Sequence, residues 1–348
     1  MARKAIYGIG FDGGNHEAVI AFDGRRIISA PNYISDGRMS DLMGLRAGAG
    51  ERAGLGKDEH IIEYEGRSYF VGALAINQGR EPRNSINDNG RYWQHNLLAL
   101  MALASAAFSD DHITLRVVTG LPVNVYRNSS MREEVAKRLP GSYSYSYNGK
   151  PRQLTIEQVR IVMEGQAAAL LAGHKNTRAT QALIDMGGRT TGFVYLEEGQ
   201  IVPDKCGVLE GGIERVGQVL AALVRDTHGR AMKPRDVRKA LRISLLEKGR
   251  ATVTVAGNEV DISAFVGTAV RSVALEIEAR ARQLWTDNDD HRIAFDCAQV
   301  ALVGGGAYYF SDHLRDVIAA PVKVASDPEL ANVRAYKALA DRLWTVEG

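Results

Sequence analysis

The stretch Leu183–Thr191 reads LIDMGGRTT and carries much of the information about the fold. An apolar run leads into it and ends at the acidic Asp185, which is typical of a buried strand that stops at a polar site. Two glycines follow, and they allow a tight turn in which backbone N–H groups come close to an anion. The apolar residues Gly192–Leu196 then predict a return strand. The stretch therefore predicts a hairpin that binds an anion at its tip, with a carboxylate beside it.

A second stretch near the start of the chain has the same pattern. The apolar run Ala5–Phe11 ends in Asp12–Asn15, which reads DGGN, and His16–Phe22 predicts the return strand. A single Asp-Gly-Gly is usually only a turn. Two such hairpins about half a chain apart predict two related half-domains that grip one polyphosphate.

A glycine triplet adds a third part of the same site. Gly304–Gly306 follows the apolar strand Gln299–Val303, and Ala307 opens a helix. A backbone without side chains lets a flat base or a ribose pass closely, and a helix N-terminus favours phosphate. None of the three clusters has the Gly-Lys-Ser/Thr ending of a P-loop. Together they predict nucleotide binding, with aspartates suited to Mg²⁺ because it prefers hard oxygen ligands.

Composition sets wider bounds on the protein. The 348 residues suffice for two domains, and 45% hydrophobic with 24% charged residues is an ordinary globular balance. A net charge of +2 does not indicate that the chain as a whole binds nucleic acid. The two cysteines, Cys206 and Cys297, are far apart and predict neither a disulfide framework nor a metal site. No signal peptide or membrane-length apolar run is evident, so we expect a cytoplasmic protein.

Periodicity predicts the remaining elements. Helices are expected over 91–108, 211–224, 234–243, 263–285 and 329–343, and strand hairpins over 61–71 and 251–262, the latter turning at Gly257-Asn258. The stretch Pro31–Asp58 is rich in Gly, Ser, Arg and Asp and predicts an exposed insertion.

The ordered set of motifs resembles the actin superfamily of ATPases, which has two phosphate hairpins, two connecting segments and an adenosine loop. Two further stretches, Val117–Val123 and Asp327–Tyr336, resemble the prokaryotic ParM-like branch. The resemblance spans essentially the whole chain and is loosest over Pro31–Asp58 and Lys233–Asp261.

This resemblance implies an α/β, duplicated actin-like (ribonuclease H-like) fold with two domains around a nucleotide cleft. Domain I is expected over 1–160 plus 325–348, with a small insertion subdomain at about 30–90. Domain II is expected over 161–324.

The resemblance also implies that ATP or GTP binds with Mg²⁺, held by Asp12 and Asp185. The expected nucleotide contacts are Asp12, Gly13, Gly14 and Asn15 of the first hairpin, Gly187, Gly188, Arg189 and Thr190 of the second, Gly212, Glu214 and Arg215 at a helix start, and Gly304, Gly305, Gly306 and Ala307 of the adenosine loop. Thr191 is expected to add a further hydroxyl donor.

Two residues are candidates for orienting the attacking water beside Asp185. Glu164 matches the glutamate of bacterial actin-like proteins, and Gln166 sits nearer the glutamine position of eukaryotic actin. We favour Glu164, since a carboxylate can accept a proton from water in line with the γ-phosphate. Glu164 can equally be a helix N-terminal residue that satisfies free N–H groups. Many family members carry a lysine on the second strand of the first hairpin, whereas His16–Ile20 has none. Either Asn15, His16 or Arg189 substitutes for it, or phosphate binding is weaker.

The function implied is an ATPase that assembles head to tail with itself, because a heterologous contact that does not close gives an open filament. ATP would favour assembly and hydrolysis would weaken it. Plasmid or other DNA segregation through a DNA-binding adaptor, without direct nucleic-acid or membrane contact, rests on family analogy alone. The alternatives are a small-molecule kinase of the same fold and a non-hydrolysing ATP-binding scaffold. Phosphate release without any added acceptor would favour the filament-forming ATPase, and strict dependence on a sugar or acid would favour the kinase.

Overall fold

The computed structural model describes residues 5–14, 16–23, 26–38, 40, 42, 55–56, 58–84, 92–171, 179–286 and 292–344. The chain forms two compact units. Unit 1 takes residues 1–121, 125–163 and 332–348, and unit 2 takes residues 122–124 and 164–331. The domain bounds expected from the sequence stay a prediction.

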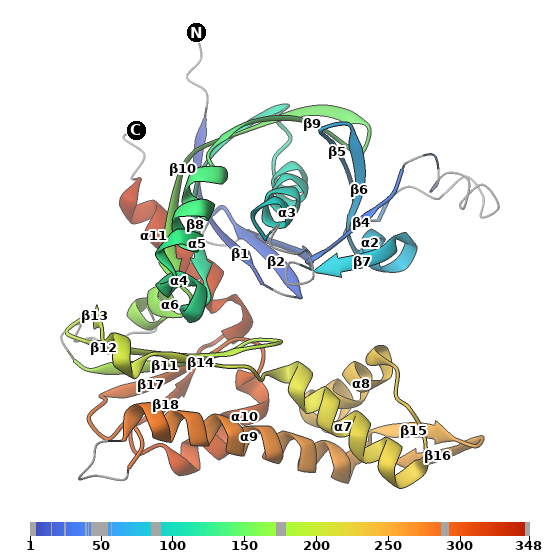
Figure 1. Cartoon of the computed structure of the whole chain (residues 1–348), viewed down its shortest axis with the longest axis vertical. Helices are drawn as coiled ribbons and strands as arrows, with labels where there is room; N and C mark the ends of the chain where they lie inside the picture. Colours follow the sequence, from blue (N-terminus) through green and yellow to red (C-terminus); the bar gives the residue numbers. More distant parts are fainter. Residues whose placement is uncertain are drawn as a thin grey trace. The chain divides into compact units, whose positions relative to one another are not determined.

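Unit 1 is built on one long sheet. Its strand order, within the described residues, is β3-β2-β1-β8-β10-β9-β5-β6-β4-β7. The strands are β1 (Ile6–Gly13), β2 (Glu17–Ala21), β3 (Ile27–Pro31), β4 (Tyr33–Asp36), β5 (Glu59–Tyr64), β6 (Arg67–Gly72), β7 (Arg80–Asn84), β8 (His112–Leu121), β9 (Gly141–Tyr147) and β10 (Lys150–Met163). The sheet curls around α3 (Tyr92–Ala107), as Figure 1 shows.

The position of α3 follows from its sequence. Leu97–Ala104 reads LLALMALA, and each of these residues is at most 3% exposed. A helix that is apolar on every side must be covered on every side, and α3 contacts β1, β2 and β3 as well as β5 and β6. The remaining helices of unit 1 are α2 (Ala73–Gln78), α4 (Val123–Arg127), α5 (Ser129–Arg138) and α11 (Ala331–Leu343). At Gly10, β1 and α11 come so close that a Cβ would lie 2.4 Å from the Val333 carbonyl oxygen.

The expectation of an exposed insertion over Pro31–Asp58 is wrong at its start. β4 pairs with both β6 and β7, and its Ile34 and Ser35 are 3% and 0% exposed. Four residues are too short for a periodic signal, so tertiary pairing decides the structure here. Residues 43–54 of this stretch lie outside the described residues.

Unit 2 has a smaller sheet of order β13-β12-β11-β17-β18, with β14 paired to β12. Its strands are β11 (Gln181–Met186), β12 (Thr191–Glu197), β13 (Gln200–Ile201), β14 (Gly207–Leu209), β17 (Gln299–Val303) and β18 (Val322–Val324). Its helices are α6 (Gln166–Leu171), α7 (Ile213–His228), α8 (Pro234–Leu241), α9 (Ser263–Trp285) and α10 (Ala307–Val317). A π-helical turn, Arg242–Leu246, extends α8, and short 3₁₀ turns cover Pro203–Lys205 and Pro328–Leu330.

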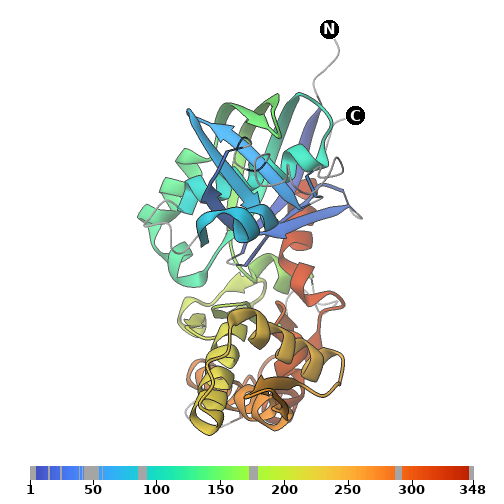
Figure 2. The ribbon, with the colours of Figure 1, turned by 90° about the vertical axis from the view of Figure 1, so that its right-hand side faces the viewer.

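The predicted helices are confirmed, with small shifts at their ends. α9 packs against α7 and α10 (Figures 1 and 2). Its buried residues include a stripe spaced by three or four residues: Val266, Ala269, Val273, Ile277, Ala281 and Trp285. The helix expected from residue 329 begins as α11 at Ala331, after the 3₁₀ turn. The ribbon β15 (Thr252–Val255) and β16 (Asn258–Asp261) turns at Ala256-Gly257, one residue before the expected position.

The two units repeat one arrangement of strands. In unit 1, β1 pairs antiparallel with β2 and parallel with β8; in unit 2, β11 pairs antiparallel with β12 and parallel with β17. Asp12 and Asp185 occupy the ends of the corresponding strands β1 and β11. The duplication predicted from the two acidic hairpins is therefore present in the fold. None of the described helices combines the length and apolar composition needed to cross a bilayer.

Burial of His60 makes the stability of unit 1 depend on pH. His60 is 1% exposed, and its Nδ1 lies 3.2 Å from the Tyr147 hydroxyl. Burial lowers its pKa from 6.5 to about 4, with Asp58 and Glu59 opposing the shift. The folded state thus favours neutral imidazole, and this contribution is complete above pH 6.5 and is lost as the pH falls towards 4.

Because of His60 alone, we expect the free energy of unfolding to be about 2 kcal/mol lower at pH 5 than at pH 7. Glutamine cannot titrate, so His60→Gln should lose less stability over the same interval. Urea unfolding of both proteins at the two pH values measures the difference. Equal losses in the two proteins would contradict the assignment.

Candidate functional site

A small cavity lies within unit 2, at the end of β11. Its volume is about 30 Å³, and its lining residues are Val123, Glu164, Asp185, Gly187, Thr190, Gly192 and Val208. Three of these lining residues, Asp185, Gly187 and Thr190, belong to the second acidic hairpin predicted from the sequence. The predicted catalytic candidate Glu164 is also there, although it is distant in sequence from the hairpin.

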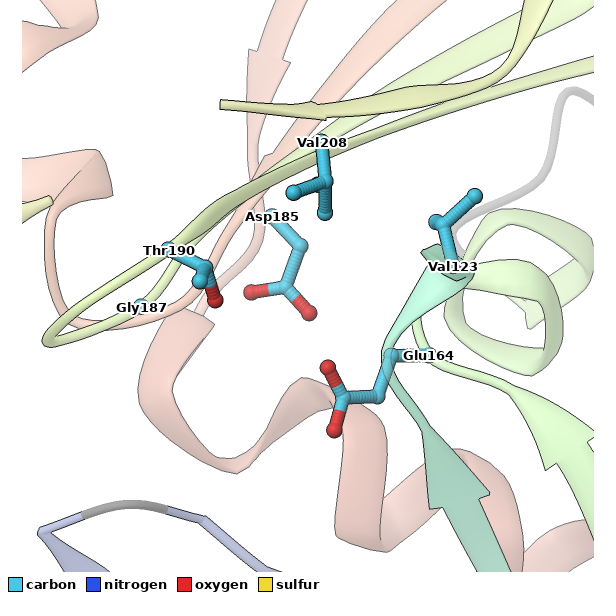
Figure 3. A pocket seen from close by; sticks show the side chains of 7 residues that line it. Val123, Glu164, Asp185, Gly187, Thr190 and Val208 are labelled. Atoms are coloured by element: carbon cyan, nitrogen blue, oxygen red, sulfur yellow. The ribbon is translucent and has the colours of Figure 1, made fainter. Parts of the chain in front are cut away.

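The two acidic residues of the cavity face each other. Figure 3 shows the carboxylates of Asp185 and Glu164 pointing toward one another, with Thr190 beside Asp185 and the apolar Val123 and Val208 at the sides. Like charges at close quarters favour a cation between them, and carboxylate oxygens suit Mg²⁺. Within the described residues, this cavity included, there is no group of three or more His, Cys, Asp or Glu that could hold a metal ion, so the cavity offers a cation two carboxylates. The donor chemistry of this cavity therefore fits a divalent cation that keeps water or phosphate oxygens as its other ligands.

Strand pairing and one glycine fix Asp185. The residue pairs with Gly192 of β12 and Val303 of β17, so it sits in the middle of the sheet at the end of its strand. Gly304 follows β17 with φ +79°, and a Cβ there would lie 2.5 Å from the Met186 carbonyl oxygen and 2.7 Å from Asp185 Oδ1. Both the backbone conformation and the close approach require glycine at this position.

A second glycine directs Glu164 into the cavity. Between β10 and α6 the chain turns at Glu164-Gly165, and Gly165 has φ +79°. A Cβ at Gly165 would lie 2.6 Å from Leu183 Cδ2, so the turn packs directly on β11. Gln166 begins α6 and does not line the cavity. Of the two candidates, Glu164 lines the cavity, and its role in orienting water stays a prediction.

Helix α7 fixes the tip of the second hairpin. The N–H of Ile213 donates to the Gly187 carbonyl at 3.3 Å, and the N–H of Glu214 donates to the Gly188 carbonyl at 2.8 Å. In a trans peptide the C=O and the following N–H point in opposite directions. The N–H groups of Gly188 and Arg189 therefore point away from α7, and neither donates a hydrogen bond within the described part of the chain. Two adjacent N–H groups aimed one way form an anion-binding concavity.

The remaining residues of the second hairpin support this tip. The Gly187 N–H donates to the Thr190 carbonyl at 2.9 Å, so it closes the turn. The expectation that Thr191 donates to a ligand is wrong: its side chain is fully buried, and its hydroxyl donates to the Gly211 carbonyl at 2.7 Å. Thr190, the residue before β12, lines the cavity instead.

The helix start predicted to contact a nucleoside also holds the second hairpin, and its contact with a nucleoside stays a prediction. At Gly212 a Cβ would lie 2.3 Å from the Gly187 carbonyl oxygen, so only glycine lets α7 approach the hairpin. Glu214 contributes its backbone N–H to Gly188. The side chain of Arg215 is directed to α9, where it lies 3.3 Å from Glu276 in a half-exposed ion pair.

The glycine triplet is anchored to the end of β11. The Gly306 N–H donates to the Met186 carbonyl at 2.8 Å, and the Gly304 N–H donates to the Pro328 carbonyl at 2.7 Å. Ala307 is fully buried beneath the loop, with its N–H bonded to the Gly304 carbonyl. Gly304 and Gly305 are both partly exposed, and contact of the triplet with a nucleotide stays a prediction.

The first hairpin belongs to unit 1. Asp12 and Gly13 end β1, and a Cβ at Gly13 would lie 2.5 Å from Asn96 Oδ1 of α3. Gly14 follows in the turn, and its carbonyl accepts a hydrogen bond from Asn32. Asn15 lies outside the described residues. A metal ion shared by Asp12 and Asp185 stays a prediction, as does the substitute for the missing lysine.

Sequence reasoning missed three kinds of residue at these hairpins. Val123 and Val208 form the apolar sides of the cavity, and Gly165 allows the tight turn that carries Glu164. Asn32 holds the first hairpin from a loop with no periodic pattern. The glycine after Glu164 was the one available signal, because a glycine between a strand and a helix often marks a positive φ.

Two family models match the chain. "Actin like proteins N terminal domain" matches residues 10–166, and "Archaeal actin homologue MreB-like, C-terminal" matches residues 183–316. A comparison with curated protein sequences gives no match.

Among solved structures, Ta0583, an archaeal actin homolog, matches with a TM-score of 0.76 at 17% identity, over 97% of this chain and 99% of that chain. Its complex with ADP gives a TM-score of 0.74 at 17% identity, again over 97% and 99% of the two chains. A 15-stranded ParM filament from Clostridium botulinum matches with a TM-score of 0.74 at 18% identity, over 97% and 99%.

These matches, the duplicated strands and the paired hairpins define an actin-like fold. The chain belongs to the actin superfamily, and ParM proteins and archaeal actin homologues are among its structural relatives. The predicted family and the predicted α/β actin-like fold are confirmed.

The contact between α7 and the second hairpin gives a test with two neighbouring glycines. Gly212→Ala should lower stability by about 1–3 kcal/mol, because the new methyl group collides with the Gly187 carbonyl. It should also speed hydrogen exchange at residues 187–190. Gly211→Ala is the control, since a Cβ there meets nothing closer than 3.7 Å. Thermal unfolding and amide exchange that do not distinguish the two variants would contradict the role given to α7.

Proposed function

We propose that this protein binds a nucleoside triphosphate with Mg²⁺, hydrolyses it, and assembles head to tail into filaments. One observation carries the proposal: two carboxylates converge in a cavity beside a hairpin tip whose N–H groups point away from α7. This set offers acceptors for a cation and donors for an anion side by side. A metal-bound polyphosphate needs both.

Each group in unit 2 then has a definite task. The N–H groups of Gly188 and Arg189 donate to phosphate oxygens, and the Thr190 hydroxyl lies on the cavity as a further donor. Asp185 holds the cation, and Asp12 is assigned the same task from the first hairpin. Mg²⁺, when bound, neutralises phosphate charge and acts as a Lewis acid.

Glu164 is the residue assigned to the water. Its carboxylate points into the cavity from a turn fixed by Gly165, so its direction does not depend on a flexible loop. It accepts a hydrogen bond from the attacking water and holds the water for in-line displacement. It takes the proton of the water as the new O–P bond forms and the bond from the γ-phosphorus to the bridging oxygen breaks, so that the nucleoside diphosphate leaves. Apolar Val123 and Val208 limit the number of other waters that reach this carboxylate.

The relatives support the nucleotide and filament parts of the proposal. A solved structure of Ta0583 is a complex with ADP, and the Clostridium botulinum ParM forms a 15-stranded filament. We assign ATP or GTP binding and self-assembly to this chain by extension from those proteins and from its own hairpins. DNA or plasmid segregation through a DNA-binding adaptor, in the cytoplasm, completes the proposal.

Replacing the proposed base should separate binding from hydrolysis. Glu164→Gln keeps the size of the side chain and removes the proton acceptor, so we expect turnover to fall by roughly 10²–10⁴-fold. The dissociation constant for nucleotide should stay within about threefold. Phosphate release and nucleotide titration measure the two effects. The control is Glu133→Gln, which changes an exposed glutamate of α5.

Two results would count against this assignment. Unchanged turnover in Glu164→Gln would favour the non-hydrolysing scaffold or another base. Formation of a nucleoside diphosphate only in the presence of a sugar or acid acceptor, with the phosphoryl group on the acceptor, would favour the kinase.

Assembly is tested by light scattering and pelleting of the purified protein. We expect a sedimenting species with ATP or GTP and Mg²⁺, and its loss in Asp185→Asn, because that variant removes a cation ligand. Electron microscopy identifies the species as a filament. No sedimenting species with any nucleotide would defeat the polymer part of the proposal.

A further inference from the structure

The tip of the first hairpin is tied to the body of unit 1 by one buried asparagine. Asn32 lies between β3 and β4 and is 0% exposed. Its backbone N–H donates to the His16 carbonyl at 2.8 Å, and its Nδ2 donates to the Gly14 carbonyl at 2.7 Å. The two carbonyls flank the turn, so Asn32 holds it from both sides.

The helix α3 in turn holds Asn32. The Oδ1 of Asn32 lies 3.0 Å from Nε2 of His95, and the Asn32 backbone carbonyl lies 3.3 Å from the same nitrogen. Because the Gly14 carbonyl can only accept, the amide nitrogen of Asn32 must face it and Oδ1 must face His95. Nε2 of His95 is therefore the protonated nitrogen and donates to Asn32.

The neighbouring residue of α3 touches the hairpin directly. Asn96 is 5% exposed, and its amide packs against Gly13 where a Cβ would otherwise lie. Two consecutive residues of α3 thus reach the hairpin, Asn96 by contact and His95 through Asn32. Both lie on a helix whose next eight residues are all apolar and buried.

This polar group is unusual for its surroundings. Burying an imidazole and an amide costs free energy that hydrogen bonds only partly return, and apolar side chains would pack here without that cost. The hydrogen bonds from Asn32 to Gly14 and His16, and from His95 to Asn32, instead fix one conformation of the turn. The segment that they fix contains Gly13 and Gly14, which have the most backbone freedom to lose.

We propose that His95 and Asn32 are positioning residues, the His95–Asn32 clamp, which hold the first hairpin in the conformation that binds phosphate. The inference rests on the proposed function and adds residues that do not touch the nucleotide. The clamp also has a consequence for the lysine that is missing from β2. Without that lysine, the first hairpin offers phosphate mainly its peptide N–H groups, and these point in defined directions only if the backbone is held in one conformation.

The test compares three histidine variants. His95→Leu removes the donor, His95→Gln keeps an N–H donor at a similar reach, and His60→Leu removes another histidine of unit 1. His60 is as buried as His95, each being 1% exposed, and its hydrogen bond goes to Tyr147 instead of the hairpin network. The readouts are the dissociation constant of a fluorescent ATP analogue with Mg²⁺ and the hydrogen exchange of a peptide over residues 10–20.

We expect His95→Leu to weaken nucleotide binding by about tenfold or more and to speed exchange in the hairpin peptide, since an unmade buried hydrogen bond costs at least that much. His95→Gln should stay within about threefold of the unmodified protein. His60→Leu should lower the melting temperature without altering either readout. Asn32→Asp should also weaken binding, because it keeps the acceptor for His95 but loses the donor to Gly14.

Several outcomes would overturn the clamp. These are unchanged binding in His95→Leu, equal weakening in His95→Leu and His95→Gln, or equal weakening in His95→Leu and His60→Leu. If the unmodified protein binds no nucleotide, the proposed function fails. Hydrogen exchange still separates the two failures, because faster exchange limited to His95→Leu supports the clamp and unchanged exchange overturns it.

Discussion

The site in unit 2 depends on two hydrogen bonds between the start of α7 and the second hairpin. The N–H groups of Ile213 and Glu214 donate hydrogen bonds to the carbonyls of Gly187 and Gly188. The N–H groups at the positive end of the helix therefore bind protein acceptors rather than a ligand. The helix acts on an anion indirectly, because it sets the direction in which the tip presents its own N–H groups. Gly212 permits this contact, since any side chain there would push the two elements apart.

The two units hold their equivalent glycine turns in place by different contacts. Each sets an aspartate at the end of a strand and a glycine turn after it. In unit 2 a helix N-terminus holds the turn by its backbone, whereas in unit 1 the side chains of Asn32 and His95 do so. A duplicated strand pattern therefore does not imply a duplicated scaffold, and each hairpin has its own points of sensitivity to mutation.

The sequence was sufficient for the parts that local patterns encode. LIDMGGRTT predicted β11, the turn and the place of Asp185, and helical periodicity predicted α3, α7 and α9. It favoured Glu164 over Gln166 but could not place Glu164 in the cavity, because that placement depends on the turn at Gly165, whose φ is positive. It did not predict the pairing of β4 or the burial of Thr191 and Asn32, since those depend on partners distant in the chain.

The enclosure of α3 has a consequence for synthesis on the ribosome. The curl around this helix is completed where β5 pairs with β9, at Ile62 with Tyr147. The apolar helix is thus made well before the strand that joins the two parts of its cover, and ribosomes add only about 5–20 residues per second. During that delay the nascent chain exposes Leu97–Ala104, a surface of the kind that chaperones bind and that aggregates when left unprotected.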